Sequence, residues 1–496
     1  MEALTRRGVL GGVLAGLAAT GIASRVGAEA PLSSPKPPER PLVKTAAAKA
    51  TGPSSDALIE AAKLGGDVSF LLADLKSGEV IAAHLPDKQM PPASTAKSIT
   101  SLYALEALGP DYRFPTRVLA TGPVEGGVLK GDLILAGGGD PTLSTDNLGD
   151  LAKVLSGLGL RRIAGRFGVW AGALPYIDSI DPGQPDWLGY NPAVSGLNLN
   201  FNRVNFTWER SGDGYQVGFD ARAERFAPAV SIARMKVVAR DLPIFTYDQR
   251  GTVESWTVAD QALGKGGSRW MPVRRPDLYA GDVFRTLARA EGLDLPEQEI
   301  LAGLPKARIL AAHDSDPLPV VLRDMMKYST NMTAEAVGMA ASLAQGVVGH
   351  SASAEAMTRW IATRTGLADE RFVDHSGLGG ASRVTASDMV AALRALGPRA
   401  GLGGLMKEVK FKGAKGIDQT LLPQRVVGKT GTLNFVSALV GYLTTASGEE
   451  RVFAIYSADV ARRDAVPDAQ REDPPGLGPW LKRARKLQLQ LLASWA

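Results

Sequence analysis

Apolar positions near the start of the folded part of the chain follow first a strand pattern and then a helix pattern. Residues 67–84 (DVSFLLADLKSGEVIAAH) hold two apolar-rich runs joined at Lys76-Ser77-Gly78, which predicts a β-hairpin. Residues 94–108 then place apolar side chains at helical intervals, and Gly109-Pro110 follows. The chain therefore opens with a hairpin and a helix that ends at Leu108.

The pattern changes twice more along the chain. Between Thr116 and about Met271, short apolar runs are separated by Gly, Asp and Pro, which favours one or two mostly β domains. Helical periods return after Tyr279, and the chain closes with three neighbouring antiparallel strands and a helix, predicted at 425–432, 437–445, 451–458 and 477–496. This order predicts one α/β domain made of residues 55–115 and 272–496. It is interrupted at 116–271 by an insertion of one domain or two nested domains.

The first residues have the pattern of an export signal. Arg6-Arg7 precedes a Gly/Ala-rich apolar run that ends at Ala23, and the small residues Val26-Gly27-Ala28 follow. The run is short and Gly-diluted for a membrane span of about 20 residues, so a cleaved signal is preferred to a retained anchor. We interpret residues 1–28 as a twin-arginine signal peptide and the Pro-rich residues 29–54 as a linker, and we expect the protein in the periplasm.

Composition excludes several kinds of chemistry. The 496 residues include no Cys, so disulfides, Cys-ligated metals and a Cys nucleophile are excluded. The four His residues form no H-x-x-x-H pair, so neither a metal site nor a cofactor is predicted. The 56 Lys and Arg residues against 51 Asp and Glu are spread along the chain, without the basic stripe that a nucleic-acid partner requires.

Ser94-Thr95-Ala96-Lys97 places a hydroxyl and an amine on one face at the start of the predicted helix. A serine is a weak nucleophile until a base takes its proton, and a partly desolvated lysine can serve as that base. The S-x-x-K pattern arises by chance about once in a chain of this length, and Ser33-Ser34-Pro35-Lys36 is a second copy. Pro35 prevents the helix that would align that copy, so Ser94 is the candidate nucleophile.

Two further motifs follow in order. Ser329-Thr330-Asn331 lies between two helical runs, and Lys429-Thr430-Gly431-Thr432 lies on a predicted strand. S-x-x-K, an S-D-N type triplet and K-T-G together are the signature of serine β-lactamases and penicillin-binding proteins. Singly, each has a structural interpretation, as a helix cap, a break between helices or a solvated strand end. Their joint order favours an active site with catalytic Ser94, Lys97, Ser329, Asn331 and Lys429, and with substrate bound by Thr430, Gly431 and Thr432.

These motifs make the chain similar to the serine-type D-alanyl-D-alanine carboxypeptidase/endopeptidases, the class C low-molecular-mass penicillin-binding proteins. The similarity runs from about Ser54 to the C-terminus and includes residues 92–97, 135–143, 279–281, 328–332 and 374–378. Between Ser94 and Ser329, 329 − 94 = 235 residues leave room for an insertion that a compact β-lactamase lacks. The resemblance implies a transpeptidase-like domain with a five-stranded antiparallel sheet flanked by helices. A second domain is inserted in it, and a third in the second.

The resemblance also implies a reaction, acyl transfer through a serine ester on peptidoglycan stem peptides, with β-lactam antibiotics as inhibitors. Ser94 attacks the carbonyl of the penultimate D-Ala, with Lys97 as base. Ser329 relays a proton to the leaving amine, and Asn331 binds the substrate's amide.

The strand motif supplies the other groups that the resemblance implies. Lys429 provides charge for the terminal carboxylate and keeps Lys97 deprotonated, while Thr430 and Thr432 bind that carboxylate. The oxyanion lies between the backbone N–H groups of Ser94 and Thr432. Gly431 suits a strand whose backbone comes close to substrate.

One stretch departs from the family pattern. Members of the family carry an acidic residue in the inserted domain that binds the ammonium group of a diaminopimelate side chain. The corresponding stretch here, residues 169–174, has Ala171 and no carboxylate. Asp178 and Asp181 are the candidate substitutes.

Other interpretations differ in chemistry. A serine β-lactamase or an S-x-x-K esterase uses the same motifs, and a non-catalytic wall-binding protein keeps the fold without needing Lys97 and Lys429 together. A hydrolase with G-x-S-x-G is excluded because the pentapeptide is missing. His375-Ser376 is followed by Gly377, which favours a structural loop over a His–Ser pair. The last helix has an apolar face and early basic residues, so packing on the sheet is preferred to a weak membrane-surface association.

Export is predicted to depend on the arginine pair. Arg6→Lys together with Arg7→Lys removes the feature that the twin-arginine route recognises, and the Gly-diluted apolar run is a poor substrate for the general secretion route. Cell fractionation is expected to find the double variant retained in the cytoplasm. Normal amounts of mature protein in the periplasm would contradict this prediction.

Overall fold

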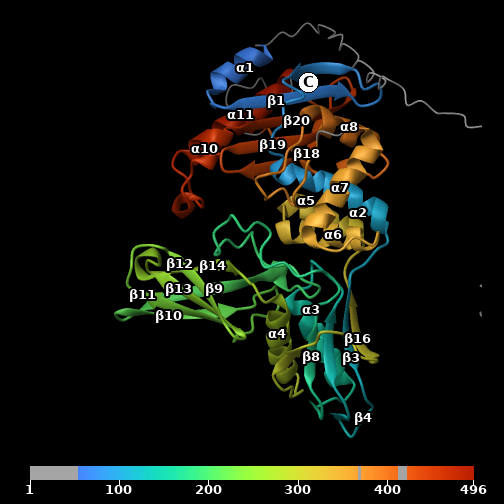
Figure 1. The fold of residues 1–496 in the computed structure, drawn as a ribbon, viewed down its shortest axis with the longest axis vertical. Coiled ribbons are helices and arrows are strands. Elements are labelled where there is room, and N and C mark those ends of the chain that lie inside the picture. Colours follow the sequence, from blue (N-terminus) through green and yellow to red (C-terminus); the bar gives the residue numbers. More distant parts are fainter. Residues whose placement is uncertain (1–53, 367–369, 412–421) are drawn as a thin grey trace, which may run out of the picture. The chain divides into compact units, whose positions relative to one another are not determined.

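The computed structural model describes residues 54–366, 370–411 and 422–496, coloured along the chain in Figure 1. The predicted signal peptide and nearly all of the linker lie outside these residues. Residues from both ends of the chain build one antiparallel sheet, in the order β17-β18-β19-β20-β1-β2. Its strands are β17 (Lys407–Glu408), β18 (Arg425–Leu433), β19 (Val436–Thr444), β20 (Glu450–Ala458), β1 (Asp67–Asp74) and β2 (Val80–His84).

The sheet confirms the predicted hairpin and the predicted run of three neighbouring strands. β1 pairs with β2 and also with β20, which brings the first and last strands of the chain side by side. β19 lies between β18 and β20, with Lys429 opposite Val440 and Gly431 opposite Ala438. The five long strands are those that the family resemblance implies, and the two-residue β17 adds a short sixth at the edge.

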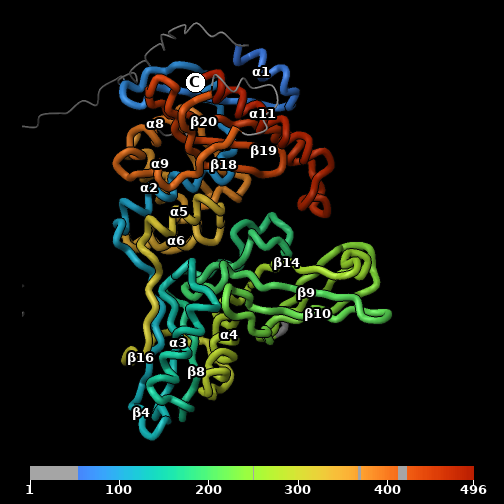
Figure 2. Tube along the Cα trace, turned by 180° about the vertical axis from the view of Figure 1, so that it is seen from behind, coloured from blue at the N-terminus to red at the C-terminus, as the bar shows by residue number. Residues whose placement is uncertain are grey.

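Helices cover both faces of this sheet, because its strands carry apolar side chains on both sides. One face packs on helices from the middle of the chain, namely α2 (Ala96–Leu108), α5 (Leu318–Tyr328), α6 (Asn331–Leu343), α7 (His350–Thr365), α8 (Ala386–Leu396) and α9 (Leu402–Leu405). The other face packs on α1 (Ser55–Ala62) and α11 (Leu477–Ser494), which lie together in Figure 2. The fold class predicted from the sequence is confirmed.

The C-terminal helix α11 packs on the sheet, as the preferred interpretation predicts. Trp480 is fully buried, and its indole N–H donates to the carbonyl of Leu64 at 2.7 Å. Leu487 and Leu491 are buried in the same cluster as Phe453 of β20. The apolar face is therefore used inside the protein. No helix in the described part of the chain is long and apolar enough to cross a membrane.

The insertion contains several sheets. One has the order β15-β8-β6-β3-β16, and helices α3 and α4 share its core. Its elements are β3 (Pro115–Ala120), β6 (Leu133–Gly137), α3 (Thr145–Gly157), β8 (Phe167–Trp170), α4 (Pro276–Ala290), β15 (Gln298–Ile300) and β16 (Arg308–Asp314). A small sheet of β4 (Val124–Glu125), β5 (Val128–Leu129) and β7 (Arg162–Ile163) lies within the same stretch.

Two further three-stranded sheets are formed by residues between β8 and α4. Their orders are β10-β9-β14 and β11-β13-β12. The strands are β9 (Arg203–Ser211), β10 (Gly214–Asp220), β11 (Ala233–Val238), β12 (Phe245–Arg250), β13 (Val253–Ala259) and β14 (Gly266–Pro272). Their position in the sequence, inside the segment that builds the first inserted sheet, supports two nested domains.

The inserted sheet continues beyond residue 271. α4, β15 and β16 complete it, with β16 paired to β3 and β15 to β8. The sequence pattern assigns residues 272–314 to the catalytic domain, because helical periods return there and periodicity does not say which sheet a helix covers. We propose that the insertion spans about 116–314 and that the catalytic domain resumes at Ser315.

Candidate active site

The candidate nucleophile lies where a short 3₁₀ turn runs into a buried helix. The turn η1 (Ala93–Thr95) continues directly into α2, and the helix ends at Leu108 as predicted. Ala93 has a φ of 47°, a left-handed conformation that costs energy in a non-glycine residue and redirects the chain before Ser94. Ser94 is half-buried, whereas the next helical turn is fully buried.

Lys97 lies one helical turn after Ser94 and contacts it. Its Nζ is 2.9 Å from Ser94 Oγ, 2.8 Å from Asn331 Oδ1 and 2.7 Å from the carbonyl oxygen of Ser376. The side chain is 0% exposed. The predicted Ser–Lys pair and the asparagine of the second motif therefore meet at one buried amine.

The second motif occupies the break between α5 and α6. Ser329 has a φ of 59° and ends α5, and Asn331 begins α6. This break turns both side chains towards the site. Ser329 Oγ accepts a hydrogen bond from Lys429 Nζ at 2.8 Å, and Asn331 Nδ2 donates to the carbonyl of Tyr190 in the insertion at 2.9 Å.

Strand β18 brings the third motif against the nucleophile's backbone. A Cβ at Gly431 would lie 2.8 Å from the carbonyl oxygen of Pro92 and 3.0 Å from the backbone nitrogen of Ser94. Such distances are too short for a side chain, so glycine is what permits this close approach. Lys429 Nζ also donates to the carbonyl of Thr430 at 2.7 Å.

The two lysines have opposite electrostatic surroundings. Burial lowers the pKa of Lys97 to about 8, and Asp374 and Glu335 oppose that fall. Burial also lowers the pKa of Lys429 well below its ordinary value, and the neighbouring cations Lys97 and Lys407 lower it further. Among the described residues no carboxylate pairs with Lys429. Without a bound anion, burial and the two neighbouring cations therefore favour the neutral form of Lys429, and its role in keeping Lys97 deprotonated stays a prediction.

A cleft of about 250 Å³ opens over this group. Ser94, Ser329, Asn331 and Thr432 line it, which brings the residues of the three motifs together. Thr430 is exposed and is not among the residues that line the cleft, and its predicted contact with the substrate carboxylate stays a prediction.

Other residues of the cleft are not identified by the motifs. They come from the insertion and from the catalytic domain and include Gln184, Tyr190, Leu378, Leu433, Asn434, Arg463 and Leu477. Leu433 and Asn434 directly follow K-T-G-T, so their place beside the motif is a signal that sequence could have used. Gln184, Tyr190 and Arg463 have no comparable signal, because tertiary folding alone brings their segments to the cleft.

Neither candidate substitute for the acidic residue missing at Ala171 is among the residues that line the cleft, but Asp181 contacts Gln184, which does line it. Ala171 lines a separate hollow with Tyr176. Asp178 accepts a hydrogen bond from the Tyr176 hydroxyl, and Asp181 accepts from the N–H of Gly183 and from the Gln184 amide. In place of a carboxylate, this part of the insertion contributes Gln184 and Tyr190 to the cleft.

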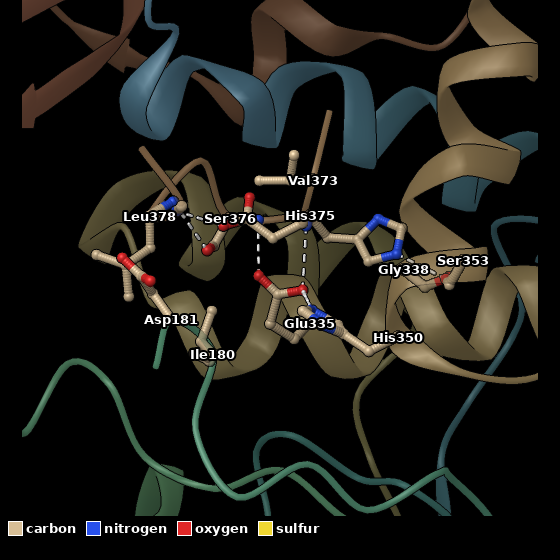
Figure 3. Close-up of polar contacts among 12 residues, drawn as sticks. Ile180, Asp181, Glu335, Gly338, His350, Ser353, Val373, His375, Ser376 and Leu378 are labelled. Atoms are coloured by element: carbon tan, nitrogen blue, oxygen red, sulfur yellow. Dashed lines mark hydrogen bonds and ion pairs between the residues drawn. The ribbon is translucent and has the colours of Figure 1, made fainter. Parts of the chain in front are cut away.

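The His375-Ser376 stretch is part of a loop and not a catalytic pair. The His375 ring contacts the Ser353 hydroxyl at 2.7 Å, and the Ser376 hydroxyl accepts from the N–H of Leu378. Figure 3 shows this loop above Glu335, whose contacts are described below. In the described residues no group of three or more His, Asp or Glu side chains is arranged to hold a metal ion.

A lysine-paired serine at the start of a buried helix, beside a K-T-G strand of an antiparallel sheet, defines a serine acyl-transfer enzyme of the transpeptidase class. Residues 54–473 match the D-Ala-D-Ala carboxypeptidase 3 (S13) family, and the chain belongs to that family. This confirms the resemblance drawn from the sequence.

Curated relatives have related names. A D-alanyl-D-alanine carboxypeptidase of Actinomadura sp. (strain R39) is 28% identical over 445 residues, which are 79% of this chain and 78% of that protein. DacB of Haemophilus influenzae, also named a D-alanyl-D-alanine carboxypeptidase, is 26% identical over 426 residues, covering 78% of this chain and 85% of that one. The solved structure of penicillin binding protein 4 (dacB) from Haemophilus influenzae has the same fold. Its TM-score is 0.74 at 21% identity, over 89% of this chain and 100% of that one.

The close approach at Gly431 gives a test of the site's geometry. Gly431→Ala is expected to push β18 away from Ser94 and to slow acylation by a penicillin roughly 10-fold, because small misplacements of reacting groups are costly. Gly404→Ala is the matched control, since a Cβ there meets nothing within 4 Å. Stopped-flow acylation rates check this. Equal rates in the two variants would show that the approach of β18 does not matter.

Proposed function

We propose that the protein is a serine-type D-alanyl-D-alanine carboxypeptidase/endopeptidase that acts on peptidoglycan stem peptides through an ester at Ser94. The observation that carries this proposal is the 2.9 Å contact between Lys97 Nζ and Ser94 Oγ, made by an amine that is fully buried. An amine whose pKa is about 8 is neutral in a useful fraction of molecules near neutral pH and can accept the serine's proton. Membership of the S13 family supports the substrate class.

In the acylation step, Ser94 Oγ forms a bond to the carbonyl carbon of the penultimate D-Ala while its proton passes to Lys97 Nζ. The backbone N–H groups of Ser94 and Thr432 stabilise the oxyanion. The carbon–nitrogen bond then breaks, and the proton reaches the leaving amine through the Ser329 hydroxyl. Water attacks the ester in the second step and gives a proton to Lys97 Nζ. The bond between the acyl carbon and Ser94 Oγ then breaks, Oγ takes that proton back, and the shortened peptide leaves with a new carboxylate.

Lys429 acts in this scheme once a substrate carboxylate is bound. An anion beside Nζ raises the pKa of Lys429 and makes it a cation, and that new charge lowers the pKa of Lys97. Binding therefore favours a charged Lys429 and a neutral Lys97. The substrate's own carboxylate thus favours the neutral form of Lys97, which can act as the base.

A serine β-lactamase remains the alternative, because it uses the same motifs. The large insertion and its cleft residues Gln184 and Tyr190 favour the peptidase, since they extend the site for a longer ligand. A solved Haemophilus influenzae relative is described in complex with a β-lactam. We propose that β-lactams acylate Ser94 here and are released slowly. We place the enzyme in the periplasm, where the predicted signal peptide would deliver it.

Ser94→Ala is expected to abolish covalent labelling by a fluorescent penicillin, because Ser94 Oγ is the cleft hydroxyl that contacts Lys97 Nζ, whereas Ser329 contacts Lys429 instead. Ser33→Ala is the matched control, since it removes the serine of the second S-x-x-K copy and should label like the wild type. The measurement is stoichiometric labelling on a gel, with the time course of label loss. Full labelling of Ser94→Ala would refute the assignment. Loss of label within seconds would favour the β-lactamase.

Lys429→Ala is expected to lower kcat/KM for a D-Ala-D-Ala peptide by about 10- to 150-fold, because a charge-assisted contact contributes ~1.5–3 kcal/mol. The variant cannot place a cation beside Lys97 in the substrate complex, so the acid limb of kcat should move to higher pH. The deficit therefore shrinks as pH rises. Release of D-Ala across a pH series measures this, and wild-type rates at pH 7 would show that Lys429 has no role.

A further inference from the structure

A loop beneath the nucleophile supplies one of the three oxygens around Lys97. Residues 374–379 pass directly under the start of α2, and the carbonyl of Ser376 accepts from Lys97 Nζ at 2.7 Å. Gly377 has a φ of 75°, and a Cβ there would lie 1.8 Å from the carbonyl oxygen of Ala93. The loop is thus pressed against the backbone that precedes Ser94, so its position sets where Lys97 points.

Glu335 holds this loop from below (Figure 3). One carboxylate oxygen accepts from the N–H of His375 at 3.0 Å, and the other accepts from the N–H of Ser376 at 2.8 Å. His350 Nε2 lies 2.8 Å from the first of these oxygens. Glu335 is 0% exposed and has no contact with the reacting groups of the three motifs, so the mechanism above does not use it.

The same helix connects Glu335 to the known motif. Asn331 begins α6 and contacts Lys97, Glu335 follows one turn later, and Gly338 lies in the next turn. A Cβ at Gly338 would lie 2.2 Å from the His375 ring, so the ring rests directly on the helix. One face of α6 therefore places Asn331 against Lys97 and seats the loop that supplies the Ser376 carbonyl.

We propose that Glu335 is a positioning residue for acylation: its carboxylate, in contact with His350, fixes the backbone of Ser376. The carbonyl oxygen of Ser376 then keeps Lys97 Nζ next to Ser94 Oγ. This inference rests on the proposed roles of Ser94 and Lys97. A carboxylate suits this position because each of its two oxygens accepts a hydrogen bond from one of the two neighbouring N–H groups. A carboxamide has only one accepting oxygen.

The charge of Glu335 has a second effect that can be separated from its geometry. The charged and titratable groups that face it come from three elements besides its own: Lys97 of α2, His350 of α7, and Asp374 and His375 of the loop. Burial alone would raise the pKa of Glu335, but His350, His375 and the hydrogen bond from Ser376 together outweigh burial and lower the pKa to about 2, so the carboxylate is charged at working pH. As an anion it raises the pKa of Lys97. Glu335 thus promotes the reaction by positioning Lys97, whereas its negative charge opposes the deprotonation of Lys97.

The test compares two variants of the full mature chain with the wild type. Glu335→Gln removes the charge and one backbone contact, whereas Glu335→Asp keeps the charge on a shorter side chain. Glu254→Gln in the insertion is the control for replacing a buried carboxyl group, because Glu254 is also buried and its Oε1 accepts from two consecutive backbone N–H groups, those of Arg274 and Arg275, which a glutamine oxygen can keep. Penicillin acylation rates are measured from pH 5 to 10 and divided by the fraction of sites that label.

For Glu335→Gln we expect the rate on the high-pH plateau to fall about 10-fold or more, because the Ser376 carbonyl is released. We also expect the acid limb to move to lower pH, since a carboxylate that raises the pKa of Lys97 is gone. Glu335→Asp should have a lower acylation rate on the plateau, with its acid limb at the wild-type pH. Glu254→Gln should keep the wild-type plateau rate and the wild-type acid limb.

The proposal would be overturned if Glu335→Gln kept the wild-type plateau rate and the wild-type acid limb. It would also be overturned if Glu254→Gln lost as much plateau rate as Glu335→Gln. If Glu335→Gln does not fold, a wild-type plateau in Glu335→Asp overturns it in the same way. Failure of the proposed function is a different result, because it appears as labelling that survives in Ser94→Ala.

Discussion

The ammonium group of Lys97 is buried among three oxygens that come from three separate segments of the chain. They are the hydroxyl of Ser94 on its own helix, the side-chain oxygen of Asn331 on α6 and the carbonyl of Ser376 in the 374–379 loop. A buried amine without such partners would be expelled or would lose its proton permanently. These contacts join α2, α6 and the 374–379 loop of the helical layer at this one group.

This constraint explains why the site needs so much of the catalytic domain. Burial favours the neutral amine, whereas Asp374 and Glu335 favour the cation, and the balance leaves the pKa of Lys97 at about 8. Asp374 in turn is held by the N–H groups of Gly377 and Gly379. Burial and neighbouring cations lower the pKa of Lys429. In the mechanism that we propose, the two lysines of the cleft have different roles, Lys97 as the base and Lys429 as the receptor of the substrate's anionic group.

Sequence was sufficient for the elements whose pattern is local. The hairpin at 67–84, the helix that ends at Leu108, the three late strands and the packed C-terminal helix follow from periodicity and from Gly and Pro stops. The motif residues can be predicted because Ser94 and Lys97 lie one helical turn apart, and because Gly431 suits a strand whose backbone comes close to substrate.

What the sequence could not give depends on contacts between distant segments. Glu335 and His350 look like ordinary polar positions of two helices until the fold places them under the 374–379 loop. The helical periods of residues 272–314 favour the catalytic domain, whereas we propose that these residues belong to the insertion, because β16 pairs with β3 across almost 200 residues of chain.

The most direct test of this account is the titration of Lys97 in the ligand-free protein. Lysine labelled with carbon-13 at Cε reports its own protonation by NMR, and the Lys97→Arg variant assigns the signal by its loss. The account predicts that the Lys97 signal titrates with a pKa of about 8, well below the ordinary value of 10.5. A Lys97 signal that titrates near 10.5 would contradict the account, because the amine would then be neither desolvated nor able to act as the base.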